Sequence, residues 1–553
     1  MLDDFALNKL SDLDQARACI VRLCNLVEEL SADNLALRAE LQRLRAEIHH
    51  LKGAQGQPKI KPNTPASGES SRVDHSSESE RRQPKLWKKA SKVEPLQVNR
   101  EVPLPIDPSQ LPADAEFKGY VPVVVQEVHF QSETIRFLKE KYYAASTRQT
   151  YLAELPPGYH GQFGPKVKAL ALVLYLGGNM SEPKLLEFLR QGGLQLSEGQ
   201  LSDLLIKDQQ VFHAEKDAIY AAGVRSSAWQ QSDHTSTRVN GQNQQCQIVC
   251  NPLYTAYVTT AKKDRLSVLA VLQNGRDLTF LFNAETQRLL EIFRLPDKLR
   301  AQLAGFPSES ELSQAAVEAL LAAALPQLGP QQRTRILDAA AVAAYHAQTE
   351  FPVIALLLCD DAPQFNWVTA ELALCWVHDG RHYKELAPAL AHHRALLDTF
   401  QDSYWMFYHE LLQYCAQPSE SERIRLEVEF DRLFATVTGY AALDARIAKT
   451  RAKKHCLLLA LAHPEIPLHN NAAELGARQR VRKRDVSFGP RTTDGTNAWD
   501  TFMTLAATAK KLGVSFYAYI KDRVCEANTL PSLADLIDAQ AKQHPLDASW
   551  HPP

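Results

Sequence analysis

The chain has 553 residues, of which 45% are hydrophobic and 23% charged, so its composition is globular and excludes a wholly disordered or fibrous protein. At roughly 150 residues per domain, this length predicts about three or four structural units. Lysine and arginine number 62 and aspartate and glutamate 64, so the net charge of -2 does not by itself indicate an anionic partner.

The sequence predicts a cytoplasmic protein without a membrane partner. No apolar run approaches the roughly 20 residues that a membrane-spanning helix needs, and the start MLDDFALNKL is acidic and lacks an apolar signal core. The nine cysteines are scattered and odd in number, which argues against a fully paired secreted scaffold. We therefore expect reduced thiols.

Residues 1–52 predict a leucine-zipper coiled coil. From Ile20 to Leu51 the apolar residues keep a seven-residue repeat, which two helices bury by winding around each other. A single Asn in such a seam favours a parallel pair in register, so we expect a homodimer. An amphipathic helix folded back on its own chain is the alternative. The expected dimerisation residues are Leu23, Leu30, Asn34, Leu37, Leu44 and Leu51.

Charged residues beside this seam also suit a parallel dimer. Exposed pairs of opposite charge add little binding energy, but they help to select the partner and its register. The residues that would face each other across the two helices are Asp33 and Arg38, Glu40 and Arg45, and Glu47 and Lys52.

Two further segments precede the helical part of the chain. Residues 53–105 are rich in Pro, Ser and charged residues, which cannot bury enough apolar surface to fold alone and therefore predict a flexible linker. Its basic residues suit phosphate contacts, although a solvated linker explains them at least as well. Residues 106–165 predict a small β-rich segment, in which the apolar run YVPVVVQEV is typical of a strand.

Residues 166–222 predict a helical unit with a helix-turn-helix outline. EPKLLEFLR, QGGLQLS and EGQLSDLLI have the patterns of a helix, a glycine turn and a capped helix. Such a pair can place its second helix in the major groove of DNA, but it is also a common way to pack two helices. The segment is crowded with acidic residues, so DNA docking and structural packing are about equally expected.

Three carboxylates far apart in the sequence lie beside clear structural signals. Asp233 is expected near the end of a strand, followed by an Asn-Gly turn and two more β-branched runs that indicate an antiparallel meander. The run FPVIALLLC predicts a strand buried on both faces, and it ends at Asp360 and Asp361. Glu474 lies in a predicted helix that Asn470 can cap.

Alone, each of these acids is explained as a cap, a turn residue or a helix-dipole partner. Together, an Asp in an early meander, an Asp after a buried strand and a late helical Glu are the parts of a two-metal nuclease site on an RNase H-like sheet. The basic segment that follows would hold DNA phosphates. Its candidate DNA-binding residues are Arg478, Arg480, Arg482, Lys483, Arg484 and Arg491.

At these residues the sequence resembles the bacterial DDE transposases of the insertion sequence sixty-six family, from the zipper to about Asp522. That family typically has DNNAAER before a basic stretch and GV-PYAYL further on, and this chain has HNNAAEL and GVSFYAYIKD. Its DGYAAY-like segment followed by CWAH-R resembles DDAPQF and CWVHDGRHY here. Its DET-like motif followed by a G-N pair resembles DHTSTRVNGQN.

The resemblance implies an α/β fold in which residues 223–525 form an RNase H-like catalytic domain with a mixed sheet. Strongly helical patterns at about 285–350 and 384–463 predict two large helical insertions in this domain, and residues 526–553 would be a C-terminal tail. The later insertion is where transposases of this type can contact DNA ends, although a solvated helix face is the default explanation of its cations. The cations concerned are Arg423, Arg425, Arg446, Arg451, Lys453 and Lys454.

The activity that the resemblance implies is DNA transposition, meaning cleavage at the ends of the element and strand transfer into target DNA. Asp233, Asp360 and Glu474 would be the catalytic residues and would bind two Mg²⁺ ions, for which Mn²⁺ can substitute; Asp361 is an alternative second acid. The protein would join the nucleoid when bound to DNA, and accessory proteins of the same element remain open as partners. The alternatives are a catalytically inactive or domesticated transposase-derived DNA-binding protein and a structural coiled-coil protein.

The chain departs from the family pattern at several positions. Residues 101–165 contain no cysteine, so we expect no zinc-binding unit there. His234 follows the first acid, and Leu475 replaces the usual Arg after the Glu. Cys375 and His378 in CWVH fall short of the four ligands of a structural zinc site, so a packing or DNA-facing role is expected for them.

Overall fold

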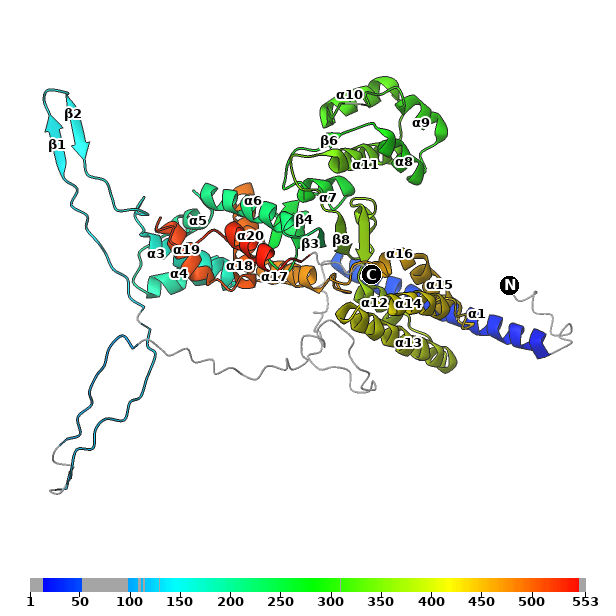
Figure 1. Ribbon diagram of the computed structural model, residues 1–553, viewed down its shortest axis with the longest axis horizontal. Coiled ribbons are helices and arrows are strands. Elements are labelled where there is room, and N and C mark those ends of the chain that lie inside the picture. Colours follow the sequence, from blue (N-terminus) through cyan, green and yellow to red (C-terminus); the bar gives the residue numbers. More distant parts are fainter. Residues whose placement is uncertain are drawn as a thin grey trace.

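The computed structural model describes residues 13–51 and 98–546, apart from 108–110, 113–114, 129 and 309. Within these ranges the chain is a mixed α/β structure built around a five-stranded sheet with the strand order β5-β4-β3-β8-β9 (Figure 1). Most of the predicted linker and the end of the predicted C-terminal tail lie outside the described residues.

The first three strands of this sheet form the predicted antiparallel meander. They are β3 (Trp229–Val239), β4 (Gln242–Cys250) and β5 (Thr255–Thr260). Asn240 and Gly241 join β3 to β4 with φ values of 49° and 76°, a left-handed pair that matches the twist of a two-residue hairpin. The expected position of Asp233 was wrong, because it lies in the middle of β3 and not near its end.

Two parallel strands complete the sheet on the other side of β3. β8 (Leu356–Cys359) pairs with β3, and β9 (Glu371–Leu374) pairs with β8. All four residues of β8 are buried, which confirms the strand predicted from the continuous apolar run. The long connection between β5 and β8 carries the first helical insertion.

Helices from the C-terminal part of the chain cover the meander. α17 (Asn471–Ser487) packs on β3 and β4, and α18 (Thr493–Lys511) packs on β5. The alternate residues Cys246, Ile248 and Cys250 of β4 point to this face and are fully buried with Ala473 of α17. This packing brings a late segment of the chain onto the strand that carries Asp233.

The chain beyond α18 also belongs to the packed structure. α19 (Phe516–Val524) packs on α3 (Pro165–Leu172), and α20 (Leu533–Gln543) packs on α6 (Gln210–Arg225). Leu533 and Ile537 of α20 are fully buried. The segment predicted as a C-terminal tail therefore contains a helix of the core. Its apolar residues recur at helical spacing and pack against α6.

The predicted helix-turn-helix outline is present between these helices. α3 continues into a short π-helix, η3 (Val173–Gly177), and is followed by α4 (Glu182–Gln191) and α5 (Glu198–Ile206). Ser197 begins α5 with a capping box in which its hydroxyl accepts from the backbone of Gln200. The helix pair is confirmed, and its docking to DNA stays a prediction.

The β-rich segment differs from its prediction. A hairpin of β1 (Lys141–Ala144) and β2 (Gln149–Leu152) projects from the body (Figure 1). Tyr120–Val128, the run YVPVVVQEV, was expected to be a strand, but it is extended chain with mostly exposed side chains, and no described strand pairs with it. A β-branched run needs a partner edge to become a strand, and Pro122 removes one of its donors.

The first helical insertion follows β5 and forms a separate lobe (Figure 1). Its helices α7 and α8 pack on α11, whose central alanines are buried, and α10 packs on a two-residue strand pair. The elements are α7 (Arg265–Leu272), β6 (Thr279–Phe280), α8 (Ala284–Ile292), α9 (Asp297–Leu303), β7 (Leu312–Ser313), α10 (Gln314–Ala324) and α11 (Pro330–Ala347).

The second helical insertion follows β9 and has its own aromatic core. Trp376 is fully buried in it, and its indole N–H donates to the carbonyl of Leu457 at 2.8 Å. Helices therefore fill both segments that the sequence predicted as helical insertions, but each helical segment begins earlier than predicted, at Arg265 and at Trp376. The helices of the second are α12 (Trp376–Lys384), α13 (Ala391–Ala416), α14 (Glu420–Leu433), α15 (Ala441–Ala452) and α16 (Lys454–Leu457).

The N-terminal segment is one helix, α1 (Leu13–Leu51), which lies beside the second insertion (Figure 1). Its seam side chains are exposed in the single chain, and the side chain of Leu51 lies outside the described atoms. Although α1 is 39 residues long, neither it nor any other described helix is apolar enough to cross a membrane. Pairing of two zippers stays a prediction.

Candidate active site

The sheet brings the first two candidate acids to neighbouring strands. β3 and β8 run parallel, and their register pairs Gln231 with Leu358. Continuing that register by two residues sets Asp233 opposite Asp360, which directly follows the last residue of β8. Acids separated by more than a hundred residues of sequence therefore meet because β8 adds to the edge of the meander beside β3.

The third acid is held by the start of α17. The side-chain amide of Asn470 donates to the carbonyl of Ser232 at 2.7 Å, and its backbone N–H donates to the Cys375 sulfur at 3.2 Å. Asn470 occupies the N-cap position of α17, as expected, but its side chain makes no cap hydrogen bond. Instead it ties the helix that carries Glu474 to the strand that carries Asp233.

Small residues let α17 approach the sheet closely. Ala473 and Gly476 face β4, and a Cβ added to Gly476 would lie 2.9 Å from the Ile248 side chain, too close without a shift of the helix. The AAELGA sequence thus sets the depth of Glu474 above the sheet. This is a physical reason for small residues on both sides of the acid.

The three acids share one electrostatic environment. The pKa of the Asp233 carboxyl is raised to about 7, chiefly by burial and then by the negative charges of Asp360 and Glu474. The backbone N–H of His234 donates to this carboxyl at 2.7 Å and acts in the opposite direction. A buried carboxyl whose pKa is raised further by two neighbouring negative charges is typical of a cation-binding site.

Replacing Asp233 by Asn is expected to stabilise the metal-free fold at pH 8. Since the folded pKa lies near 7 and the ordinary value is 3.8, the folded wild type keeps a proton that the unfolded chain has lost, and its stability falls as the pH rises from about 4 to about 7. The full shift corresponds to about 4 kcal/mol at 1.4 kcal/mol per pKa unit, so partial hydration leaves an expected gain of roughly 2 kcal/mol for the variant.

Urea unfolding in EDTA at pH 4 and pH 8 measures this effect. The variant and the wild type should unfold alike at pH 4 and separate at pH 8. A variant that is less stable than the wild type at pH 8 would show that the Asp233 carboxylate is well solvated or already neutralised.

A cation of the protein itself lies within the acid cluster. Arg381 of α12 donates to Glu474 at 2.9 Å, and its charge also acts on Asp233. Arg381 was not among the residues singled out from the sequence. It lies in the quoted segment CWVHDGRHY, but only the packing of α12 beside α17 reveals its partner, since the two residues are 93 positions apart.

Two histidines lie next to Asp360 in this cluster. Burial lowers the pKa of both His234 and His378, while the charge of Asp360 acts to raise it. The Nδ1 atom of His234 is buried without a hydrogen-bond partner among the described residues. Neutral imidazoles at this position can accept a proton or orient a ligand.

Cys375 has a structural role beside them. Its sulfur accepts the backbone N–H of His378 at 3.4 Å as the cap of α12, and it also accepts the N–H of Asn470. The thiol therefore joins the start of α12 to the start of α17. The expectation of a packing role for Cys375 agrees with these contacts.

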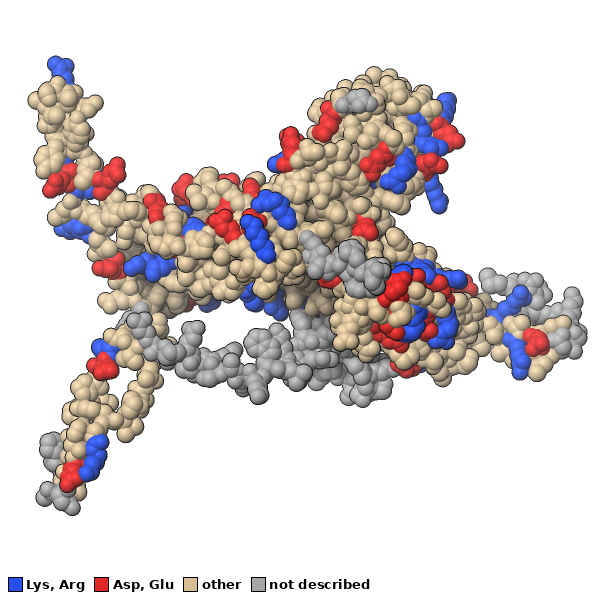
Figure 2. Space-filling model, viewed as in Figure 1, with Lys and Arg blue, Asp and Glu red and all other residues tan. Residues whose placement is uncertain are grey.

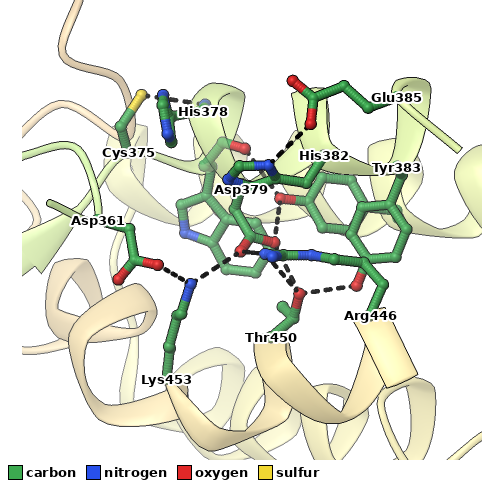
Figure 3. Close-up of polar contacts among 12 residues, drawn as sticks. Asp361, Cys375, His378, Asp379, His382, Tyr383, Glu385, Arg446, Thr450 and Lys453 are labelled. Atoms are coloured by element: carbon green, nitrogen blue, oxygen red, sulfur yellow. Dashed lines mark hydrogen bonds and ion pairs between the residues drawn. The ribbon is translucent and has the colours of Figure 1, made fainter. Parts of the chain in front are cut away.

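The structure separates the two adjacent acids after β8. Asp361 forms an ion pair with Lys453, which also lies 3.9 Å from the buried Asp379 (Figure 3). Asp379 is held in turn by Arg446 and by the hydroxyl of Thr450. Asp361 thus belongs to an ion-pair network with residues of the second insertion, whereas the charge of Asp360 acts on the Asp233 carboxyl.

The donor chemistry of this cluster fits a divalent cation in kind. Carboxylate oxygens are the ligands that Mg²⁺ prefers, and a cation would relieve the repulsion that raises the pKa of Asp233. Within the described ranges, no three side chains of the metal-binding types lie close enough together to hold an ion. Binding would require Arg381 to release Glu474 and the carboxylates to turn toward one another.

A protein of Sinorhizobium fredii (strain NBRC 101917 / NGR234), the uncharacterized protein y4jO, is 32% identical to the chain over 289 residues. The matched part is 52% of this chain and 89% of the rhizobial protein. The chain belongs to the family of that protein. No protein-family profile matches the chain, and no solved structure matches it significantly. The relationship therefore establishes kinship without assigning an activity.

In this member of the y4jO family, two of the predicted DNA-binding residues are buried, and their prediction is corrected. Arg480 is fully buried and pairs with Asp500 of α18 at 2.9 Å. Lys483 is also fully buried; it donates to the carbonyl of Tyr175, and its ammonium lies 3.3 Å from the centre of that ring. Burial lowers the pKa of Lys483 to about 7. Neither side chain can reach a phosphate without opening the fold.

The other basic residues of the segment are available at the surface to different degrees. Arg478, Arg482 and Arg491 are exposed, whereas Arg484 is partly buried and donates to the carbonyl of Ser236. Glu474, Arg478 and Arg482 are spaced by four, so they follow one face of α17. An exposed cationic stripe therefore leads away from the acid cluster.

Proposed function

We propose that the protein is a DNA transposase of the DDE type that cleaves DNA at the ends of an insertion sequence and transfers the strand to target DNA. The observation that carries the proposal is that three acids from distant segments share one electrostatic environment. The pairing of β3 with β8 sets Asp233 beside Asp360, and the charges of Asp360 and Glu474 both act on the Asp233 carboxyl. The site, and not the composition of the chain, is the reason for assigning this activity.

We further propose that the domain is RNase H-like. The support is a mixed sheet in which an antiparallel meander is followed by two parallel strands added beside its first strand. In such a sheet the first strand is central and carries an acid, and the next parallel strand ends in the second. The likeness in sequence to insertion sequence sixty-six transposases agrees with this arrangement.

In the proposed reaction, the three carboxylates hold the divalent cations, and the remaining residues orient the DNA. Two such ions, when bound, would activate the attacking oxygen and stabilise the leaving oxygen of an in-line phosphoryl transfer. The raised pKa of Asp233 favours its protonated form, so this carboxyl has to lose its proton before it can bind a cation. Arg381, once released from Glu474, is placed to pair with a phosphate, and the neutral His378 can accept a proton beside Asp360.

The experiment that tests this function is a nicking and joining assay on DNA that carries the terminal repeats flanking this gene. We expect cleavage that requires Mg²⁺ or Mn²⁺ and exposes a 3′-hydroxyl, followed by joining of that end to a second DNA. No cleavage and no joining with either ion, in the presence of proteins encoded beside it, would contradict the proposal.

A stripe on α17 is proposed to bind the DNA backbone. Replacing Arg478 and Arg482 by Gln should weaken binding to any DNA sequence and lower the salt slope of log K by about 1 per residue, because each phosphate contact releases counterions. Fluorescence anisotropy of labelled DNA over roughly 50 to 200 mM salt measures both the affinity and the salt slope.

A matched control for this prediction is Lys454→Gln, in the second insertion, where Lys454 already pairs with Asp431 at 2.7 Å. That variant should bind DNA as the wild type does. An unchanged salt slope for the Arg478 and Arg482 variant would show that α17 does not bind the DNA backbone. A loss of DNA affinity only in the Lys454 variant would place the DNA-binding surface on the second insertion.

One observation favours a second candidate function, a catalytically inactive or domesticated DNA-binding protein. Arg381 already neutralises Glu474, and the acids do not close around a point as they stand. This candidate predicts salt-sensitive DNA binding without cleavage. Arg381→Ala separates the two candidate functions. In an active enzyme the variant should bind cations more tightly, whereas an inactive relative should still cleave no DNA.

We also propose that the chain works as a homodimer through its zipper, with DNA as its partner and the nucleoid as its place of action. The support for the dimer is the seven-residue repeat of α1 with Asn34 in the seam. Accessory proteins of the same element are a further proposed partner, which the joining assay tests by their addition.

A further inference from the structure

The seam of α1 is open to solvent although the helix is attached to the body of the protein. The exposed fractions of its apolar side chains run from 39% for Leu23 to 65% for Leu37. A continuous row of large apolar side chains on one helix face is typical of an interaction surface. The exposed seam residues are Ile20, Leu23, Val27, Leu30, Leu37, Leu41, Leu44 and Ile48.

A different face of α1 holds it to the second insertion. Val21, Asn25 and Glu28 make the contacts, and in the heptad they occupy outer positions that a two-stranded coil leaves free. At 3.6 residues per turn, this outer face is roughly 150° around the helix from the seam. The two surfaces can therefore be occupied at the same time.

Glu28 is the central contact on the outer face. Its carboxylate accepts the backbone N–H groups of Ala389 and Leu390 at 2.8 and 2.9 Å, at the start of α13, and lies 3.1 Å from Nδ1 of His393. Burial acts to raise the pKa of Glu28, but these donors hold it below its usual range. The carboxylate is thus bound in its charged form at a helix N-terminus.

Asn25 makes a second contact with the loop between α14 and α15. Its amide donates to the carbonyl of Gly439 and its side-chain oxygen accepts the N–H of Ala441, both at 2.9 Å. The conformation of this loop is held by Asp444, whose carboxylate accepts the backbone N–H groups of Thr438 and Gly439. With the contacts of Val21 and Glu28, these hydrogen bonds hold about two turns of α1 against the second insertion.

The surface of the second insertion does not resemble a DNA-binding face. Acidic and basic side chains alternate over it (Figure 2), and its cations pair with neighbouring acids. The cations of the insertion proposed from the sequence for DNA contact are largely committed in this way. The pairs are Arg423 with Glu420 and Glu427, Arg425 with Glu410 and Glu422, Arg446 with Asp379, Lys453 with Asp361 and Lys454 with Asp431.

We propose that the second insertion is a platform that clamps the outer face of α1 while the seam of that helix pairs with α1 of a second copy of the chain. A parallel pair in register would set Asn34 against its own copy and Asp33 near Arg38, so the seam is self-complementary in charge and polarity. The clamp would fix the direction of the zipper relative to the site, because α12 of the same insertion carries Arg381.

This inference rests on the proposed zipper dimer but not on the proposed chemistry, and one set of full-length variants tests it. Light scattering after size-exclusion chromatography gives the mass, and hydrogen exchange gives the protection of the amides of Ala389, Leu390 and Ala441. The seam variant is Leu30→Asp with Leu37→Asp. The clamp variant is Glu28→Ala, and its matched control is Glu29→Ala at an exposed neighbouring position.

We expect a wild-type dimer and a monomeric seam variant in which the three amides stay protected. The clamp variant should remain a dimer, while the amides of Ala389 and Leu390 exchange about tenfold faster or more, as expected when a charge-assisted hydrogen bond is lost. Glu29→Ala should behave as the wild type.

Three results would overturn the inference, and they fail in different ways. A monomeric wild type removes the zipper dimer while leaving the clamp measurable by its amide protection. A seam variant that loses amide protection shows that α1 docks only within a dimer, or onto the other copy. A clamp variant with unchanged exchange shows that Glu28 does not hold the helix.

Discussion

Replacing Glu474 by Gln is expected to reduce metal-dependent DNA cleavage by at least about 1,000-fold, because cation charge contributes several kcal/mol to phosphoryl transfer and each 1.4 kcal/mol is tenfold in rate. The amide keeps the size of the side chain but loses the charge that would hold a cation. The measurement is the initial rate of nicking at the element ends in Mg²⁺, with circular dichroism as a check of the fold.

The control for this loss is Asp361→Asn, which removes a carboxylate of the same segment but outside the acid cluster. Asp361 pairs with Lys453, so its replacement should slow cleavage far less than Glu474→Gln does. Equal losses in both variants, or a loss confined to Asp361→Asn, would make Asp361 the second acid and contradict the assignment of Asp360.

Replacing Arg480 by Met is expected to destabilise the fold by about 3–5 kcal/mol, the usual cost of breaking a buried ion pair from one side. Asp500 would be left with its charge buried, since its remaining donors are the backbone N–H and hydroxyl of Thr259. Burial already raises the pKa of Asp500, and the Arg480 guanidinium opposes that rise. Urea unfolding at pH 7 measures the loss.

Arg482→Met is the matched control, because it makes the same change one half-turn along α17 on the exposed face. It should alter the free energy of unfolding by less than about 0.5 kcal/mol, as surface substitutions usually do. Similar stabilities for the two variants would show that Arg480 is not committed to the interior, and would restore it as a DNA-binding candidate.

These two arginines show what the sequence could and could not predict. Five basic residues within seven positions, 478–484, are typical of a DNA-binding surface, but α17 has one face on the sheet. The buried residues Ala473, Gly476, Arg480 and Lys483 recur at spacings of three and four, which is a helical stripe. Small residues at the start of that stripe were a signal that its later members face inward.

Local patterns predicted the elements that carry the acids. Alternation and an Asn-Gly turn indicated the meander of β3 to β5, and the continuous apolar run indicated β8 with Asp360 at its end. The same reasoning failed for Tyr120–Val128, because β propensity does not tell whether a partner strand is near. Strand prediction succeeded where the run also had a core to enter.

Contacts between distant segments could not be predicted. Arg381 meets Glu474, Lys453 meets Asp361 and Glu28 meets α13 only after the sheet and insertions have packed. None of these residues has a local pattern that names its partner, since each pair is separated by at least 92 positions. A helix folded back on its own chain was the alternative to the zipper, and α1 does contact the second insertion. The repeat describes only the seam, so it could not predict that the outer face makes this contact.

The most direct test of the central claim, that Asp233, Asp360 and Glu474 form one cation site, is a Mn²⁺ titration followed by electron paramagnetic resonance at pH 8. We expect the wild type and Asp361→Asn to bind Mn²⁺, and Asp233→Asn, Asp360→Asn and Glu474→Gln each to lose that binding while remaining folded. Unchanged Mn²⁺ binding in these three variants, or its loss only in Asp361→Asn, would contradict the account.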